Sequence, residues 1–223
     1  MTARRLIYLH GFASSPGSNK ARRFAQAFAE RGLELEVPDL NEGDFRRLTL
    51  SRQLALLERL TARQGPRSAL LFGSSMGGYV AALFAARTDR VGALVLMAPA
   101  FGFIERWAER MSEAALAEWQ RRGAMPVLHH ATGRLEPIGW SIVEDARTHP
   151  AYPEVHVPTL VFHGRSDESV DPRCSERFAA GRANVELELL DSDHSLADVV
   201  DRIIARTACF LAPFLPQLAD KER

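Results

Sequence analysis

The stretch "LLFGSSMGGYV", residues 70–80, joins a run of apolar residues to a helix-favouring segment with almost no loop between them. Glycines flank Ser75 at Gly73, Gly77 and Gly78. Glycine is the residue for which a tight turn of the backbone costs least. The plainer interpretation is a short strand-to-helix connection whose glycines let two elements pack closely. The alternative is a G-x-S-x-G nucleophile elbow, which lifts a reactive serine above the edge of a sheet.

The rest of the chain alternates short apolar runs with amphipathic segments. The apolar runs predict strands over residues 5–10, 33–39, 68–73, 92–99, 158–164 and 184–191. The amphipathic segments predict helices over 18–31, 49–63, 76–87 and 195–211. Strands separated by helices pair in parallel through right-handed crossovers, so we expect an α/β fold with a mainly parallel six-stranded sheet covered by helices on both faces. Ligands of such sheets bind at the carboxyl ends of the strands.

One interval, residues 100–157, is too long for a single crossover helix, and we interpret it as a small helical cap inserted into a single domain that spans 1–223. Its apolar residues recur at helical spacing. These are Ile104, Trp107, Met111, Ala115 and Trp119. Ser112 marks a break between two short helices and Gly123 a stop. The cap is expected to overhang the carboxyl ends of the strands.

Composition excludes several classes of protein. The 223 residues are 46% hydrophobic and 25% charged with a formal net charge of zero, which is ordinary globular composition. The arginine pairs are scattered among acidic neighbours, so no nucleic-acid partner is indicated. No apolar stretch approaches transmembrane length, and the N-terminal apolar run is too short for a signal peptide. Cys174 and Cys209 have no metal or redox spacing. We expect a cytoplasmic protein without membrane insertion, metal or organic cofactor.

A serine hydroxyl needs an adjacent base, an orienting acid and donors for an oxyanion before it can transfer acyl groups. Ser75 is the candidate nucleophile because a strand precedes it and a helix follows it, whereas Ser74 is expected to pack beside the turn. Of seven histidines, His194 is the candidate base, since it stands in a short loop, "LLDSDHSLADVV", after the last strand. His10 and His163 each precede a glycine at a strand end, where we expect them to brace loops.

The candidate acid is Asp167 in the segment "HGRSDESVD", residues 163–171, after the preceding strand. A carboxylate on that adjoining strand can approach the imidazole of His194. We expect Asp193 to cap the following helix and Asp171 to act as an N-cap before Pro172.

The order Ser75, Asp167, His194, together with the "GSSMGG" elbow, the "HGF" after the first strand and the "HGRSDESV" loop, resembles that of α/β-hydrolases over essentially the whole chain. The segments "YLHGFASSPGSNKARRFA" and "GSSMGGY" are similar to those of small bacterial esterases of the YqiA type. "EWQRRGAM", "SIVEDARTHP" and "SDHSLAD" are closer to the acyl-protein thioesterase branch. The resemblance implies the strand order 2-1-3-4-5-6 and an oxyanion hole formed by the backbone N–H groups of Phe12 and Met76.

The resemblance and the triad together imply a serine hydrolase that cleaves carboxylic ester or thioester bonds of small to medium acyl substrates. The alternatives are the same triad used on peptide or carbon–carbon bonds, and a non-catalytic binding module of the same fold. The plain His-Gly-Phe segment differs from the glycine-rich form of lipases and argues against bulky tertiary-alcohol esters. We expect an apolar acyl slot in the cap, although the same stripe of residues could simply pack a helix onto its domain. The slot residues would be Phe101, with Phe103 as its alternative at the base of the cap, together with Trp107, Met111 and Trp119.

Overall fold

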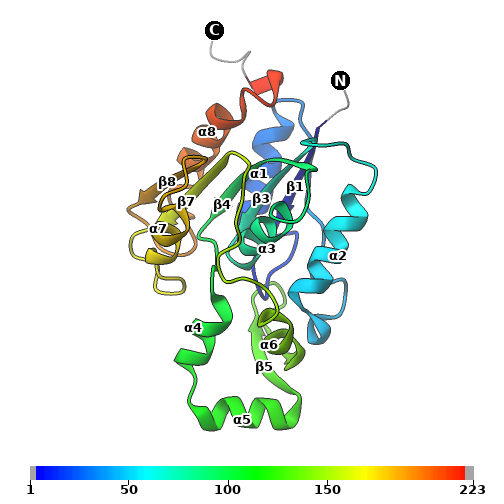
Figure 1. Cartoon of the computed structure of the whole chain (residues 1–223), viewed down its shortest axis with the longest axis vertical. Helices are drawn as coiled ribbons and strands as arrows, with labels where there is room; N and C mark the ends of the chain where they lie inside the picture. Colours follow the sequence, from blue (N-terminus) through cyan, green and yellow to red (C-terminus); the bar gives the residue numbers. More distant parts are fainter. Residues whose placement is uncertain (1–3, 219–223) are drawn as a thin grey trace.

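The computed structural model describes residues 4–218 and shows a six-stranded sheet in which all neighbouring strands are parallel (Figure 1). Its order is β2-β1-β3-β4-β7-β8, which is 2-1-3-4-5-6 when these six strands are numbered along the chain, as predicted. The strands are β1 (Arg5–Leu9), β2 (Leu35–Glu36), β3 (Ala69–Ser74), β4 (Val91–Met97), β7 (Thr159–Gly164) and β8 (Val185–Leu190).

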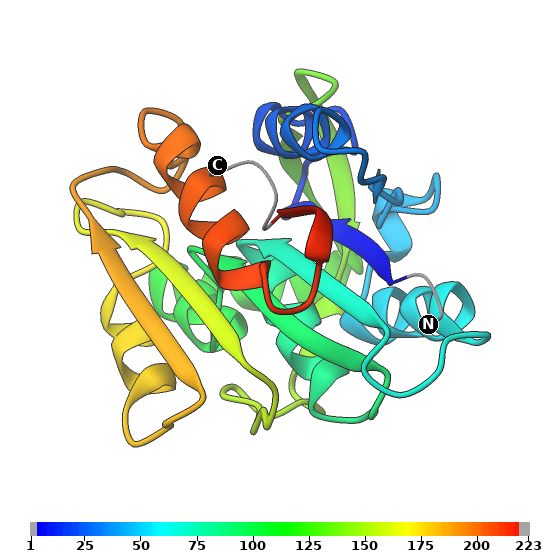
Figure 2. The same ribbon diagram turned by 90° about the horizontal axis from the view of Figure 1, so that it is seen from above.

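Helices cover both faces of this sheet, as Figure 2 shows. One face carries α1 (Asn19–Ala29) and α8 (Val200–Leu211); the other carries α2 (Leu50–Thr61), α3 (Met76–Ala85) and α7 (Arg173–Ala179). Successive side chains of a strand point to opposite faces. In β1, Leu6 and Tyr8 accordingly belong to the core under α1 and α8, whereas Ile7 and Leu9 belong to the core under α2 and α3. Two short 3₁₀ turns, η1 (Phe45–Arg47) and η2 (Pro216–Leu218), complete the body.

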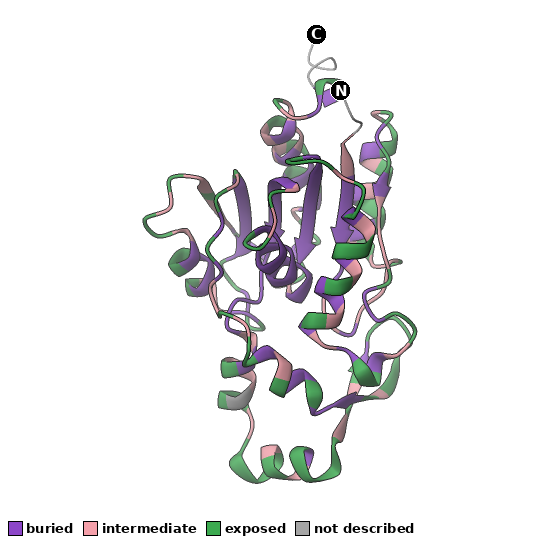
Figure 3. Cartoon of the chain, turned by 45° about the vertical axis from the view of Figure 1, so that its right-hand side comes forward, coloured by how far each residue is buried: buried purple, intermediate pink, exposed green. Residues whose placement is uncertain are grey.

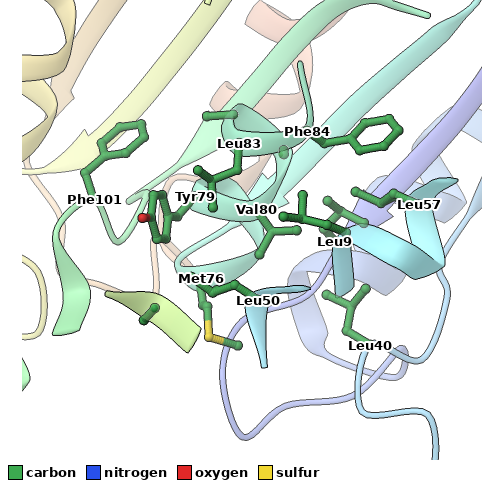
Figure 4. Packing of buried hydrophobic residues seen from close by; sticks show 14 of the residues in the cluster. Leu9, Leu40, Leu50, Leu57, Met76, Tyr79, Val80, Leu83, Phe84 and Phe101 are labelled. Carbon is green, nitrogen blue, oxygen red and sulfur yellow. The ribbon is translucent and has the colours of Figure 1, made fainter. Parts of the chain in front are cut away.

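Helix α3, which follows Ser75, is buried along its whole length, and Figure 4 shows its side chains packed among leucines from β1 and α2. A helix that is apolar on all sides is one that is enclosed by its neighbours. Ser75, in the glycine-flanked turn, therefore directly precedes a helix that is buried at every residue.

Two elements differ from the sequence prediction by more than one or two residues at an end. Strand β2 is only two residues long instead of spanning 33–39, with Pro38 beyond it lacking the N–H that a strand ladder needs. Helix α8 begins at Val200 rather than at residue 195. Residues 191–199 are a loop as a result, and His194 lies within it.

The cap, residues 100–157, leaves the carboxyl end of β4 and lies below the sheet in Figure 1. It contains the two expected helices, α4 (Phe103–Arg110) and α5 (Glu113–Arg122), and a third, α6 (Ser141–Ala146). The Ser112 hydroxyl accepts a hydrogen bond from the Ala115 N–H at 3.2 Å, and Gly123 ends α5 with a φ of 70°. Between α5 and α6 the structure adds an antiparallel hairpin, β5 (Ala124–His129) and β6 (Arg134–Gly139), which the sequence pattern does not predict.

Figure 3 shows that the sheet is buried whereas α5 is largely exposed, so the cap meets solvent far more than the body does. Among residues 4–218, no helix is both long and apolar enough to cross a bilayer.

Candidate active site

Ser75 occupies a strained turn between β3 and α3. Its φ of 53° and ψ of −119° fall where residues with a β-carbon are rare. The backbone is fixed on both sides: the Ser75 N–H donates to Met97 O at 2.9 Å, and the Ser75 carbonyl accepts from the N–H groups of Gly78 and Ala100, each at 3.0 Å. The strain is therefore held in place by the surrounding structure, as a nucleophile elbow requires.

The glycines beside Ser75 are required by close approach of backbone to backbone. A β-carbon on Gly77 would lie 2.2 Å from the carbonyl oxygen of Leu9 and 2.5 Å from that of His10. One on Gly73 would lie 2.5 Å from the carbonyl oxygen of Gly77. These distances are far below van der Waals contact, so only glycine lets the first turn of α3 press against β1 and β3.

His194 and Asp167 meet as the sequence predicts. The Nδ1 of His194 lies 2.7 Å from Oδ2 of Asp167, whose side chain is fully buried. The other carboxylate oxygen accepts from the N–H groups of Ser169 and Val170, both at 2.8 Å. Burial tends to raise the pKa of Asp167, but hydrogen bonds from His163 and His194 outweigh it and hold that pKa well below its usual range. An ionised Asp167 makes Nδ1 the donor and leaves Nε2 of His194 free to take up a proton.

His163, expected only to brace a loop, also contacts the candidate acid. Its Nε2 lies 3.1 Å from Asp167 Oδ2 and 2.9 Å from Val170 O, and its Nδ1 lies 2.7 Å from Ser175 Oγ. Because the first two partners only accept, Nε2 carries the proton, and Nδ1 accepts from the Ser175 hydroxyl. The fully buried ring of His163 thus connects the loop that carries Asp167 to α7. In the sequence, its position four residues before Asp167 is the feature that could have indicated this contact.

The loop after β1 lies directly against the serine. A β-carbon on Gly11 would be 3.4 Å from the β-carbon of Ser75. His10 braces this loop as expected: its Nε2 accepts from the Leu40 N–H at 3.1 Å and its Nδ1 donates to Gly11 O at 3.0 Å, while burial lowers its pKa. Across residues 4–218, the N–H of Phe12 donates to no other residue.

The second proposed donor is the N–H of Met76. It is the first of α3, so no preceding turn supplies an acceptor for it. Two backbone donors next to the serine suit an oxyanion.

The loop that carries His194 is fixed from two directions. A β-carbon on Gly164 would lie 2.4 Å from the carbonyl oxygens of both Ser192 and Asp193, so the end of β7 touches this loop. From α1, Lys20 Nζ lies 3.5 Å from His194 O. Burial lowers the pKa of Lys20 to about 8 even though two nearby carboxylates act to raise it. Sequence reasoning did not single out Lys20, because this contact joins residues 174 positions apart.

The two competing aspartates serve local turns. Asp193 is exposed, and its Oδ1 accepts from the Ser195 N–H at 2.8 Å within the loop 191–199. The expectation that it caps the following helix is wrong, because α8 begins only at Val200. Asp171 accepts from the Arg173 N–H at 2.9 Å, but the N-cap of α7 is Pro172, so the expectation that Asp171 is the N-cap is wrong.

A cavity of about 350 Å³ lies over Ser75 between the body and the cap. Ser75, Met76 and His194 line it from the body together with Phe12. The cap contributes mainly apolar side chains and two arginines. Together with one histidine, these are Ala100, Phe103, Arg106, Trp107, Arg110, Val127, Leu128 and His130. The rings of Phe12 and Trp107 meet edge to face with centroids 5.3 Å apart.

Of the four residues expected to form the slot, only Trp107 lines this cavity. Phe101 is fully buried and stacks on Phe178 with centroids 4.1 Å apart; Figure 4 shows it beside Tyr79 in the core. Trp119 is also buried, and its Nε1 donates to Ile138 O at 3.1 Å. Neither residue lines the cavity over Ser75, and Trp119 instead lines a separate cavity of about 220 Å³ within the cap. Helical spacing identifies an apolar face of the Trp119 helix without saying which layer that face meets.

Met111 follows the last residue of α4, Arg110, and packs against the core without lining the cavity. Phe103, the alternative to Phe101, lines the cavity.

Within the described residues, no group of three or more histidine, cysteine, aspartate or glutamate side chains is arranged to hold a metal ion.

Solved structures share this architecture. A putative hydrolase from Agrobacterium vitis S4 is 24% identical with a TM-score of 0.79, covering 93% of this chain and 88% of its own. The mouse alpha/beta hydrolase domain-containing protein 10 is 19% identical with a TM-score of 0.78, covering 94% of this chain and 90% of its own. Est1E from Butyrivibrio proteoclasticus is 20% identical with a TM-score of 0.71, covering 94% of this chain and 89% of its own.

The fold, with its glycine-flanked serine turn, is thus that of the α/β-hydrolases. No curated protein matches the chain in sequence. The family described as "Uncharacterised protein family (UPF0227)" matches residues 5–211, and the chain belongs to that family.

Proposed function

We propose that the protein is a serine hydrolase that cleaves carboxylic ester or thioester bonds of small to medium acyl substrates. One observation carries this proposal: Ser75 in its strained turn and His194 line the same cavity, and the other side of the His194 ring bonds to the buried, ionised Asp167. This arrangement supports Ser75 as the nucleophile, His194 as the base and Asp167 as the orienting acid of acyl transfer.

In this mechanism the Ser75 hydroxyl gives its proton to Nε2 of His194 as its oxygen attacks the acyl carbon. The resulting oxyanion lies beside the N–H groups of Phe12 and Met76 and the N-terminus of α3, whose dipole favours negative charge. When the tetrahedral intermediate collapses, the ester or thioester bond breaks and the leaving oxygen or sulfur takes the proton from Nε2. Water then attacks the acyl-enzyme by the same route and releases the acid and free Ser75.

The shape and lining of the cavity support a small or medium acyl group. Its volume of about 350 Å³ lies at the low end for ligand pockets, and Phe12, Phe103 and Trp107 give it apolar walls. The architecture is also that of Est1E and of the A. vitis putative hydrolase.

Labelling with a fluorophosphonate probe tests the proposal. The parent protein should be labelled, and Ser75→Ala should not be, while Ser74→Ala serves as the matched control at the adjacent hydroxyl and should still be labelled. A panel of p-nitrophenyl acyl esters, acyl thioesters and aminoacyl anilides then separates ester cleavage from peptide-bond cleavage. Persistent labelling of Ser75→Ala, or turnover of the anilides alone, contradicts the proposal.

A further inference from the structure

Helix α4 presents both apolar and basic side chains to the cavity over Ser75. Residues three and four apart share a helix face. Phe103, Arg106, Trp107 and Arg110 have this spacing, and all four line the cavity. Neither glutamate of the helix does so, and no carboxylate side chain is among the described residues that line it. The wall is therefore partly apolar and partly cationic.

Neither arginine is held in place by a carboxylate, although the charge of Arg106 is among the causes that keep the pKa of Asp171 below its usual range, after the hydrogen bonds from Arg173. Arg106 Nη1 donates to Phe101 O and lies 2.7 Å from Cys174 Sγ. Arg110 Nη2 donates to Glu168 O at 2.7 Å. Within residues 4–218, neither guanidinium forms an ion pair with a carboxylate.

Other arginines of this chain behave differently, since several pair with glutamate. Examples are Arg59, Arg90 and Arg206. A guanidinium has five N–H donors, and the contacts of Arg106 and Arg110 use one nitrogen on each. Those contacts orient the two groups and leave further donors for a ligand in the cavity. Two like charges four residues apart also disfavour each other unless an anion joins them.

We propose that the substrate of this hydrolase carries an anionic group, a carboxylate or a phosphate, which Arg106 and Arg110 bind. The inference rests on the proposed function. Guanidinium groups bind such anions through charge-assisted, often bidentate hydrogen bonds. The apolar part of the substrate would lie against Phe103 and Trp107, on the adjacent stripe of the same helix.

The competing explanation is mechanical: the two arginines could only fasten the cap to the body, Arg106 through Phe101 O and Arg110 through the acid loop at Glu168 O. In that case their removal would impair charged and neutral substrates equally. A charge-binding role predicts a selective loss, so substrate pairs that differ only in charge separate the two explanations.

The experiment measures kcat/KM for two such pairs. In the acyl arm, mono-p-nitrophenyl glutarate is compared with p-nitrophenyl valerate. In the leaving-group arm, the valeryl thioester of 3-mercaptopropionate is compared with that of 3-mercaptopropionamide. The proteins are the parent, Arg106→Gln, Arg110→Gln and, as matched control, Arg121→Gln, whose side chain pairs with Glu118 on the exposed face of α5.

In at least one arm the parent should prefer the charged substrate, and that arm shows which part of the substrate carries the anion. Each cavity variant should lower the charged-to-neutral ratio by about tenfold, the size expected for a charge-assisted hydrogen bond. The preference should also weaken as salt rises, and Arg121→Gln should keep the parent's ratio. A parent without charge preference in either arm, or variants with an unchanged ratio, overturns the inference while ester hydrolysis stands. A parent that cleaves no substrate contradicts the proposed function instead.

Discussion

The strain at Ser75 should be measurable as stability when this residue is replaced by glycine. A residue with a β-carbon held in such a region of φ and ψ costs on the order of 1–3 kcal/mol, and Ser75 has a φ of 53° and a ψ of −119°. Glycine removes that cost but loses roughly 0.5–1 kcal/mol more backbone entropy on folding. The difference predicts that Ser75→Gly raises the free energy of unfolding by about 1 kcal/mol.

Ser75→Ala is the matched control, because alanine removes the hydroxyl and keeps the β-carbon that causes the strain. Thermal unfolding is the assay. For a chain of 223 residues, about 1 kcal/mol corresponds to a shift in Tm of roughly 2–4 °C. Ser75→Gly should therefore melt a few degrees above Ser75→Ala, with both variants unlabelled by the fluorophosphonate. If Ser75→Gly melts at or below Ser75→Ala, the turn stores no strain and this reasoning is refuted.

Three further predictions follow from the same geometry. Gly77→Ala should destabilise the fold by about 1–3 kcal/mol or more in urea unfolding, since its β-carbon would lie 2.2 Å from a carbonyl oxygen of β1, whereas Gly65→Ala, with open space around it, should not. Asp167→Asn should lower kcat by up to about 10⁴-fold. Hydrogen bonds hold the pKa of Asp167 in the folded protein below its usual range. The stability that the ionised carboxylate contributes is therefore present above about pH 4 and is lost as the pH falls through the pKa of the folded state. The parent and Asp167→Asn should accordingly converge in free energy of unfolding towards acid pH. Trp107→Ala should change the chain-length profile for acyl esters, while Trp119→Ala should lower Tm and keep that profile, and an equal effect of both on the profile would count against the cavity assignment.

The sequence predicted the body of the fold and the meeting of Asp167 with His194 because both depend on local rules. Strand-to-helix alternation dictates a parallel sheet, and the glycines at strand ends record backbone contacts that no other residue permits. The roles of these side chains in catalysis remain a proposal that the labelling experiment addresses.

The cap was harder to predict because its structure depends on contacts between distant segments. In the hairpin β5–β6, Pro126 and Pro137 face each other across the strands, and proline argues against a strand when the sequence is read alone. Phe101 and Trp119 are apolar residues of the cap, yet both side chains are buried and neither lines the cavity over Ser75. The contacts of His163 and Lys20 with the loops of the site likewise appear only once the chain has folded.

The complete burial of α3 has a consequence for how such a protein can diverge. The serine stands on a helix enclosed on every side, where almost any exchange of volume carries a cost in folding. The walls over it come largely from α4 and the hairpin, on a solvent-facing appendage whose side chains can change at little cost to the body. Laboratory evolution aimed at new substrates should therefore randomise positions 103, 106, 107, 110 and 127 and leave residues 73–85 untouched. Libraries that randomise residues 73–85 instead would consist mostly of proteins that do not fold.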